Sequence, residues 1–288
     1  MQIVSDRAMD LTNEQMTGLN NIALVPLVFT LDGKSYRSGE DIQPDEFYHL
    51  LASTESFPTT SQPSAGDFAE LYKRVAAIDP EILSIHISSG LSGTLNSAIE
   101  GAKIALEAKV THFDSKTLSG ALGWQVWAAA RAAQAGWSKE KIIALIQKIG
   151  DATNMLYTLS TMKYLIHGGR ISHLKGLLAT VLNIKPIIGV EKEFGKYFQQ
   201  GQERTLKRAV EKLADYIAQQ HPLGSALRIQ IMHGNNIEEA TRLREKLNGM
   251  FNCTWLPTCS IAPVLGAHTG PGLVGVVFAP QAVFAEVP

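Results

Sequence analysis

The sequence predicts an α/β fold in two parts, a mostly parallel sheet flanked by helices followed by an α+β part with a mixed sheet. Short apolar runs alternate with segments of helical period as far as residue 149, as in repeated βαβ units. Beyond that point, short strands are joined by hairpins as well as helices. We therefore expect two domains, 1–160 and 161–288.

Composition limits the classes of function. A chain of 288 residues that is 45% hydrophobic can bury substantial cores. A net charge of −1 argues against nucleic acid held by bulk charge. With only Cys253 and Cys259 and no signal peptide, we expect a reducing cytoplasm. No apolar run approaches the ~20 residues of a spanning helix, so we expect at most peripheral membrane contact.

The central stretch is 82–98, ILSIHISSGLSGTLNSA. Its apolar start predicts a buried strand, and its end has helical spacing. Ser88–Thr94 therefore lies where a strand ends and a helix begins, the usual ligand position in an open α/β sheet. Free N–H groups there favour an anion. The alternative is that Ser89 or Ser92 only caps the helix. The stretch matches neither a P-loop nor a nucleophile elbow.

The other elements follow from local signals. A first strand at 3–4 leads into the turn 5–11, where we expect Asp10 to be a turn or cap residue. A strand at 23–30, a hairpin turn at 32–34 and a helix at 44–52 come next. Further strands are expected at 110–113, 155–160, 184–190, 196–200, 228–232, 253–258 and 273–279, and further helices at 65–76, 118–135, 138–149, 161–167, 172–181, 205–219 and 237–247.

A loop rich in hydroxyl groups, FPTTSQPSA, spans 57–65. Ser64 with Asp67 three residues later resembles a capping box, which explains Ser64. Thr60, Ser61 and Gln62 precede the cap and have no such explanation. We expect these three side chains to face a ligand.

Four motifs together resemble one known family. They are Thr60–Ser64, Ser88–Thr94, Gly168–Arg170 and His268–Gly272. In combination they are similar to the DegV family, the fatty-acid-binding subunits of bacterial fatty acid kinase, over 3–279. The first motif departs from the family pattern T-D-S-T-x-D-L, because Arg7 replaces a small hydroxyl residue.

The resemblance implies a DegV-like fold and a function. Such a protein holds a long-chain fatty acid in an apolar tunnel and presents its carboxylate to a separate ATP-binding kinase subunit, which makes an acyl-phosphate for phospholipid synthesis. It implies no catalytic residue, metal or cofactor in this chain. Carried over to this sequence, the carboxylate site comprises Thr60, Ser92, Ser61, His268 and, as a weaker candidate, Arg204. Arg170 contacts the kinase subunit or the phosphoryl group.

Elementary energetics agree with this assignment. A charge-assisted hydrogen bond contributes roughly 1.5–3 kcal/mol. Burial of about fifteen methylenes at ~0.8 kcal/mol each offers on the order of 12 kcal/mol. The tail should therefore dominate affinity, while hydroxyls fix the position of a carboxylate without a permanent cation beside it. Arg170 also has a structural explanation, since a cation is favourable after a helix that ends at glycine.

Two other functions remain open from the sequence. A stand-alone serine hydrolase would use Ser92, His268 and an aspartate such as Asp6, and needs Ser92 within hydrogen-bond reach of His268. A phosphate- or sugar-binding regulator would hold a polar ligand at the same loops. Identification of the molecule extracted from the purified protein discriminates among the three.

Overall fold

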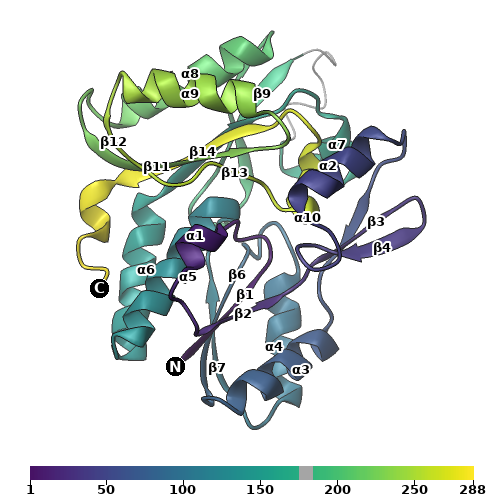
Figure 1. Ribbon diagram of the computed structural model, residues 1–288, viewed down its shortest axis with the longest axis vertical. Helices are drawn as coiled ribbons and strands as arrows, with labels where there is room; N and C mark the ends of the chain where they lie inside the picture. Colours follow the sequence, from purple (N-terminus) through teal and green to yellow (C-terminus); the bar gives the residue numbers. More distant parts are fainter. Residues whose placement is uncertain (175–183) are drawn as a thin grey trace.

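A four-stranded parallel sheet forms the first half of the computed structural model, which describes residues 1–174 and 184–288. Its strands are, in spatial order, β2 (Ile22–Val25), β1 (Gln2–Asp6), β6 (Glu81–His86) and β7 (Lys109–Asp114) (Figure 1). One face packs on α3 (Ala65–Ala76) and α4 (Thr94–Ile104), the other on α5 (Ser119–Gln134) and, behind it, α6 (Lys139–Ala152). The predicted parallel α/β part is confirmed.

The second sheet is mixed, as predicted. Its order is β10 (Tyr197–Glu203), β9 (Lys185–Val190), β8 (Asn154–Thr158), β14 (Val274–Pro280), β11 (Ala226–His233) and β12 (Asn252–Trp255), with the short β13 (Cys259–Ser260) also on β11. Neighbours are antiparallel except where β12 and β13 pair with β11. Successive side chains of β14 point to opposite faces of this sheet. Val276 packs on the side of α8 (Leu206–Gln220) and α9 (Ile237–Asn248), whereas Val277 packs in the core around α5.

A small antiparallel sheet of β4 (Lys34–Arg37), β3 (Val28–Leu31) and β5 (Thr59–Ser61) was not anticipated. The single strand expected at 23–30 is two strands, because the chain turns at Pro26 and leaves the first sheet. The hairpin turn between β3 and β4 is confirmed, with Asp32 and Gly33 both at positive φ. Thr60 therefore lies on a strand and not in a loop.

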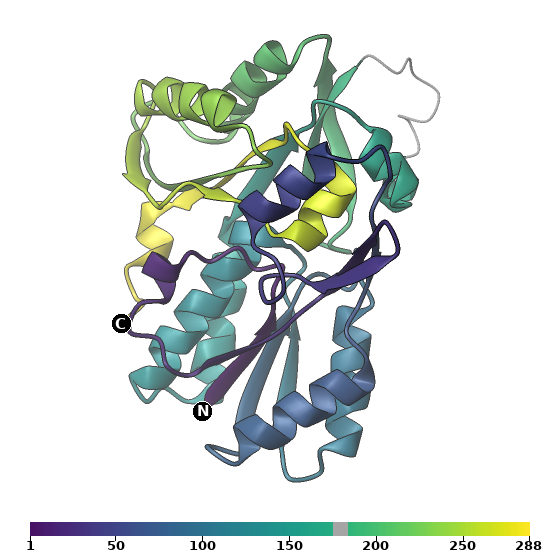
Figure 2. The same ribbon diagram turned by 45° about the vertical axis from the view of Figure 1, so that its right-hand side comes forward.

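Short helices fill the space between the sheets. They are α1 (Asn13–Met16), α2 (Pro44–Ala52), α7 (Lys163–His167), α10 (Pro263–Thr269), and the 3₁₀ helices η1 (Arg170–His173) and η2 (Gln281–Phe284). Figure 2 shows α2 beside α10 near the junction of the two halves. The helix expected at 172–181 falls mostly outside the described residues. In the described part, no helix combines the length and apolarity needed to cross a membrane.

The expected domain limits remain a prediction, but the topology favours an earlier boundary. β8 lies between β9 and β14 in the second sheet, whereas a division at residue 160 would assign it to the first half. The helical pair α5 and α6 ends at Ala152. A division just before Asn154 keeps each large sheet whole.

Candidate functional site

The four motifs line one cavity of about 320 Å³, here termed the hydroxyl cavity. Its walls are Leu27, Thr60, Ser61, Gln62, Ile87, Leu91, Ser92, Arg170, Tyr197, Val264, Leu265 and His268. Thr60 and Ser61 come from β5, Ser92 from the turn before α4, and His268 from α10. Five residues that the sequence indicated, separated by up to 208 positions, are thus brought together.

Thr60 and His268 form the central contact. Thr60 Oγ1 lies 2.8 Å from His268 Nε2. Burial, with the nearby Arg170 charge, lowers the pKa of His268 from 6.5 to about 3, so the ring is neutral at pH 7. A neutral ring that donates through Nε2 leaves the hydroxyl hydrogen of Thr60 for a ligand. Thr60 is then a donor aimed at an acceptor such as a carboxylate oxygen.

This neutral histidine predicts a pH effect on stability. The unfolded chain binds a proton at His268 below about pH 6.5 and the folded protein does not until near pH 3. Stability therefore falls as pH falls through this window, by at most about 1.4 kcal/mol per pH unit. We expect the urea midpoint of His268→Gln to depend less on pH in this window than the urea midpoint of the wild type. Parallel wild-type and variant curves between those pH values would contradict the assignment.

Ser92 is positioned by a link between two motifs. Gln62 Nε2 donates to Ser97 Oγ on α4 at 2.9 Å, and the Gln62 side chain crosses directly over Gly93. A Cβ at Gly93 would lie 2.1 Å from Gln62 Oε1, so a larger residue there would displace the Gln62 side chain. Ser92 Oγ lies 2.8 Å from Thr94 Oγ1 and accepts from Thr94 N. Gln62 was expected to face a ligand; it also ties β5 to α4.

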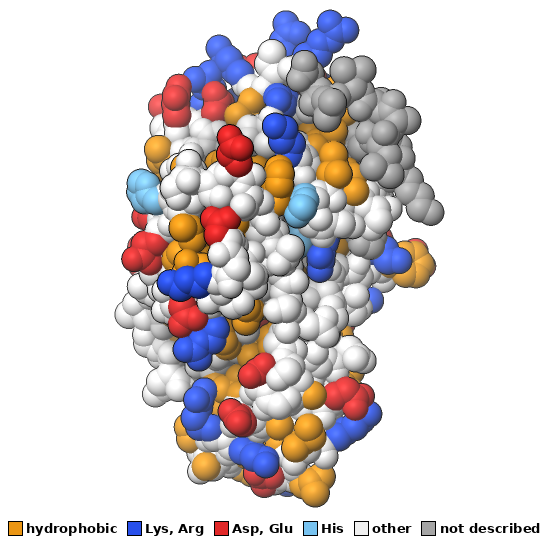
Figure 3. Space-filling view, turned by 90° about the vertical axis from the view of Figure 1, so that its right-hand side faces the viewer, with side chains coloured by type: hydrophobic (Ala, Val, Ile, Leu, Met, Phe, Trp, Pro, Cys, Tyr) orange, Lys and Arg blue, Asp and Glu red, His pale blue; other side chains and the backbone are white. Residues whose placement is uncertain are grey.

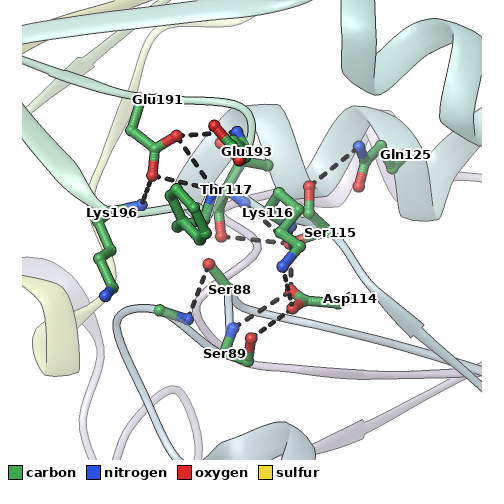
Figure 4. A network of polar contacts seen from close by, with 12 residues as sticks. Ser88, Ser89, Asp114, Ser115, Lys116, Thr117, Gln125, Glu191, Glu193 and Lys196 are labelled. Carbon is green, nitrogen blue, oxygen red and sulfur yellow. Dashed lines mark hydrogen bonds and ion pairs between the residues drawn. The ribbon is translucent and has the colours of Figure 1, made fainter.

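The turn between β9 and β10 packs against the serine loop (Ser88–Thr94) and belongs to a network of polar contacts there (Figure 4). The Glu191 carboxylate accepts hydrogen bonds from the backbone of Glu193, Phe194 and Lys196. The turn presses on Ser88–Gly90, where a Cβ at Gly90 would lie 2.2 Å from Phe194 O. Below it, Ser89 donates to Asp114. This packing places Tyr197 in the cavity wall.

The three arginines singled out in the sequence occupy different places in the structure. Arg170 lies in the hydroxyl cavity and donates from Nη1 to Gly168 O at 2.7 Å, so a permanent cation stands beside the residues expected to hold the carboxylate. Arg204 is exposed between β10 and α8 and is not among the residues that line the cavity, so its place near the head group stays a prediction. Arg7 lines a different cavity.

An apolar pocket continues from the hydroxyl cavity. Tyr197, Leu265 and His268 line both. The remaining lining of the apolar pocket is Leu118, Ser119, Met155, Tyr157, Met232, Ile261, Thr269, Leu273, Gly275 and Val276. Its volume is about 40 Å³, far below the roughly 300–1,000 Å³ of small-molecule sites. A hydrocarbon chain entering it must displace side chains such as Met155 and Met232.

The hydrolase arrangement does not form. Ser92 and His268 bond to Thr94 and Thr60, and His268 Nδ1 has no hydrogen-bond partner among the described residues. Asp6 instead lies 3.0 Å from His86 Nδ1, and His86 Nε2 lies 2.6 Å from Ser84 Oγ. These three side chains are fully buried, so this Asp–His–Ser chain has no access for a substrate. Sequence reasoning missed His86.

Comparison with known proteins gives the family. The model of the DegV family of uncharacterised proteins matches residues 1–281. The chain belongs to the DegV family. A DegV domain-containing protein of Deinococcus radiodurans is 33% identical over 280 residues, which cover 97% of this chain and 96% of that one. Another, from Staphylococcus aureus, is 34% identical over 278 residues, with 96% and 97% covered.

Solved DegV structures share the fold. The fatty acid binding protein DegV from Bacillus subtilis aligns with a TM-score of 0.87 and 25% identity, covering 97% of this chain and 99% of that one. A DegV lipid binding protein from Thermotoga maritima gives 0.86 and 26%, covering 97% and 98%. A fatty-acid-binding DegV family protein from Thermus thermophilus gives 0.84 and 28%, covering 97% and 99%. The two-part DegV-like fold expected from the motifs is confirmed.

Proposed function

We propose that this protein binds a long-chain fatty acid, with the carboxylate in the hydroxyl cavity and the hydrocarbon chain in the apolar pocket. The observation that carries the proposal is the continuity of the two spaces through Leu265, Tyr197 and His268. One space offers hydroxyl donors and Arg170, and the other is walled almost entirely by hydrocarbon. Fatty acid binding by the solved DegV relatives supports it.

The direct test is mass spectrometry of organic extracts from the purified protein. We expect an intact long-chain fatty acid in near-stoichiometric amount. A polar metabolite in the extract, or an empty protein that cleaves ester substrates, would contradict the proposal. The first result would favour a phosphate- or sugar-binding regulator and the second a hydrolase.

The role of Thr60 has its own test. Thr60→Val keeps the shape of the side chain and removes the hydroxyl donor. We expect affinity for the fatty acid to fall about tenfold or more, since a hydrogen bond to a charged group contributes roughly 1.5–3 kcal/mol. Competition against a fluorescent fatty acid measures it. Thr30→Val, on the neighbouring strand β3, is the matched control and should bind as wild type.

A fatty acid methyl ester tests whether Thr60 acts on the charged carboxylate. Its affinity is measured for wild type and for Thr60→Val. The ester should lose less affinity than the free acid on Thr60→Val, because its neutral carbonyl oxygen accepts a weaker hydrogen bond than a carboxylate does. An unchanged affinity of Thr60→Val for the free acid would remove Thr60 from the site. The same design applies to Ser92→Ala, with Ser61 as a secondary position at the rim.

We also propose that a separate ATP-binding kinase subunit phosphorylates this carboxylate in the cytoplasm. The carboxylate oxygen would take the γ-phosphoryl group of ATP, which releases ADP and leaves an acyl-phosphate. The support is the resemblance to fatty acid kinase subunits and the position of Arg170 at the cavity. A guanidinium there suits the negative charge on a transferring phosphoryl group.

Arg170→Ala should separate binding from phosphorylation. We expect the variant to retain bound fatty acid, because the tail supplies most of the binding energy, yet to lower the coupled rate with a cognate kinase at least tenfold. Arg204→Ala removes an exposed arginine outside the cavity and is the control. Equal coupled rates for wild type and Arg170→Ala would end the assignment.

A further inference from the structure

A second cavity of about 350 Å³ lies apart from the proposed lipid site, and we term it the Arg7 cavity. It shares no lining residue with the hydroxyl cavity or the apolar pocket. Its walls come from the segment after β1, the end of β4, the start of α2 and the segment from β13 to α10. They are Arg7, Met9, Asp10, Leu11, Thr12, Asn13, Met16, Ser38, Gly39, Gln43, Pro44, Asp45, Cys259, Ser260, Ala262 and Pro263.

Arg7 is a cation without a partner in this cavity. Its side chain lies across Gly39, where a Cβ would come within 3.2 Å of Arg7 Cδ. The Arg7 side chain is half-buried; its Nε is buried and has no hydrogen bond, and Arg7 forms no ion pair among the residues described. A buried donor left unsatisfied costs roughly 1–3 kcal/mol. An acceptor group on a ligand would remove that cost.

Asp10 and Asp45 also line the Arg7 cavity, and neither carboxyl group forms an ion pair with Arg7. Asp10 accepts hydrogen bonds from Ser119 Oγ at 2.6 Å and Ala262 N at 2.8 Å, which fixes its position. Its φ of +43° is strained for a residue other than glycine. Asp45 lies 3.4 Å from Ser260 Oγ. Burial raises the pKa of Asp10 from 3.8 to about 7, so Asp10 carries only part of a negative charge at pH 7. A simple anion beside Arg7 would therefore meet repulsion chiefly from Asp45, in addition to the attraction of Arg7.

The remaining walls are apolar or neutral. Met9, Leu11, Met16 and Pro263 offer hydrocarbon and thioether surface, and the fully buried Ser38 accepts from Val264 N through its hydroxyl oxygen. We propose that the Arg7 cavity binds a small zwitterion of the amino-acid type. Its carboxylate pairs with Arg7, its ammonium group faces Asp45 and Asp10, and an apolar side chain rests on Met9, Leu11 and Met16.

The charge pattern favours a zwitterion over the other small ligands. Inorganic phosphate or a fatty acid carboxylate would pair with Arg7 but leave its remaining charge near Asp45 and Asp10. An amine alone would leave Arg7 unpaired. The volume of the cavity is at the lower end of the roughly 300–1,000 Å³ of ligand sites, which suits a single amino acid.

Titration calorimetry on the full chain tests this with L-leucine and L-methionine as probes. We expect at least one to bind saturably with one site per chain. L-leucinamide, which lacks the carboxylate, and isocaproate, which lacks the ammonium group, should bind at least tenfold more weakly than leucine. Arg7→Met keeps an unbranched side chain but removes the guanidinium and should weaken binding at least tenfold, whereas Arg37→Met, at an exposed arginine, should not.

Three results would overturn the proposal. They are no heat of binding with either amino acid, equal binding by leucine and its two analogues, and unchanged affinity in Arg7→Met. Inorganic phosphate binding as tightly as leucine would also overturn it and would indicate an anion site. Arg7→Met should retain its fatty acid, so the amino acid site and the proposed lipid site are tested separately.

Discussion

Replacement of Asp6 by alanine will lower the free energy of unfolding by about 3–5 kcal/mol, because its buried carboxylate supports three donors. Asp6 Oδ1 accepts from Ala8 N at 3.0 Å, and Oδ2 accepts from Ile87 N at 2.9 Å beside His86 Nδ1. Beyond His86, Ser84 Oγ lies 2.7 Å from Tyr72 Oη. The variant leaves several buried groups without partners, and urea denaturation measures the loss.

Two further variants make the Asp6 result specific. Asp6→Asn keeps one acceptor oxygen and should lose less stability than Asp6→Ala. Glu286→Ala removes a carboxylate from an exposed pair with Lys148 and should change the urea midpoint very little. A stability of Asp6→Ala close to that of Glu286→Ala would show that the buried chain contributes nothing.

Blocking the junction of the two cavities will have the largest effect on ligand binding. Leu265 lies on α10 and lines both the hydroxyl cavity and the apolar pocket. Leu265→Trp places a large ring where the hydrocarbon chain must pass. The loss of burial for even four methylenes, at ~0.8 kcal/mol each, weakens binding more than a hundredfold. We expect the purified variant to contain no fatty acid and to bind no fluorescent analogue.

Leu265→Met is the matched control. It changes the shape of the side chain but barely its volume, so this variant should retain the lipid. Circular dichroism separates blocking from unfolding, because the tryptophan variant should keep its folded spectrum. A Leu265→Trp protein that still carries fatty acid would show that the chain takes another route.

The parts of the site that depend on residues close together in the sequence could be predicted from the sequence. The strand, turn and helix predicted around Ser88–Thr94 are present, and so is the capping box of Ser64 with Asp67. That the turn binds a ligand stays a prediction. The Thr60–His268 contact joins positions 208 apart and depends on packing of α10 against β5, which no local pattern encodes. For the same reason the Asp6–His86 pair was missed, because a histidine within an apolar strand gives no sign of its partner.

Charge on the surface agrees with the composition. Lysine and arginine side chains lie interspersed with aspartate and glutamate over the face drawn in Figure 3. Such a mixture gives no broad field of one sign on that face. Recognition on that face would rest on individual groups and not on bulk attraction.

The contact of Gly90 with the backbone of Phe194 makes the two halves of the chain mutually dependent. The β9–β10 hairpin brings Tyr197, at the start of β10, into the wall of the hydroxyl cavity, and the second half also supplies Arg170, Val264, Leu265 and His268. A fragment ending before Asn154 would therefore carry the serine loops yet lack these five walls. Engineering by domain exchange should therefore transfer this hairpin together with the loop that it covers.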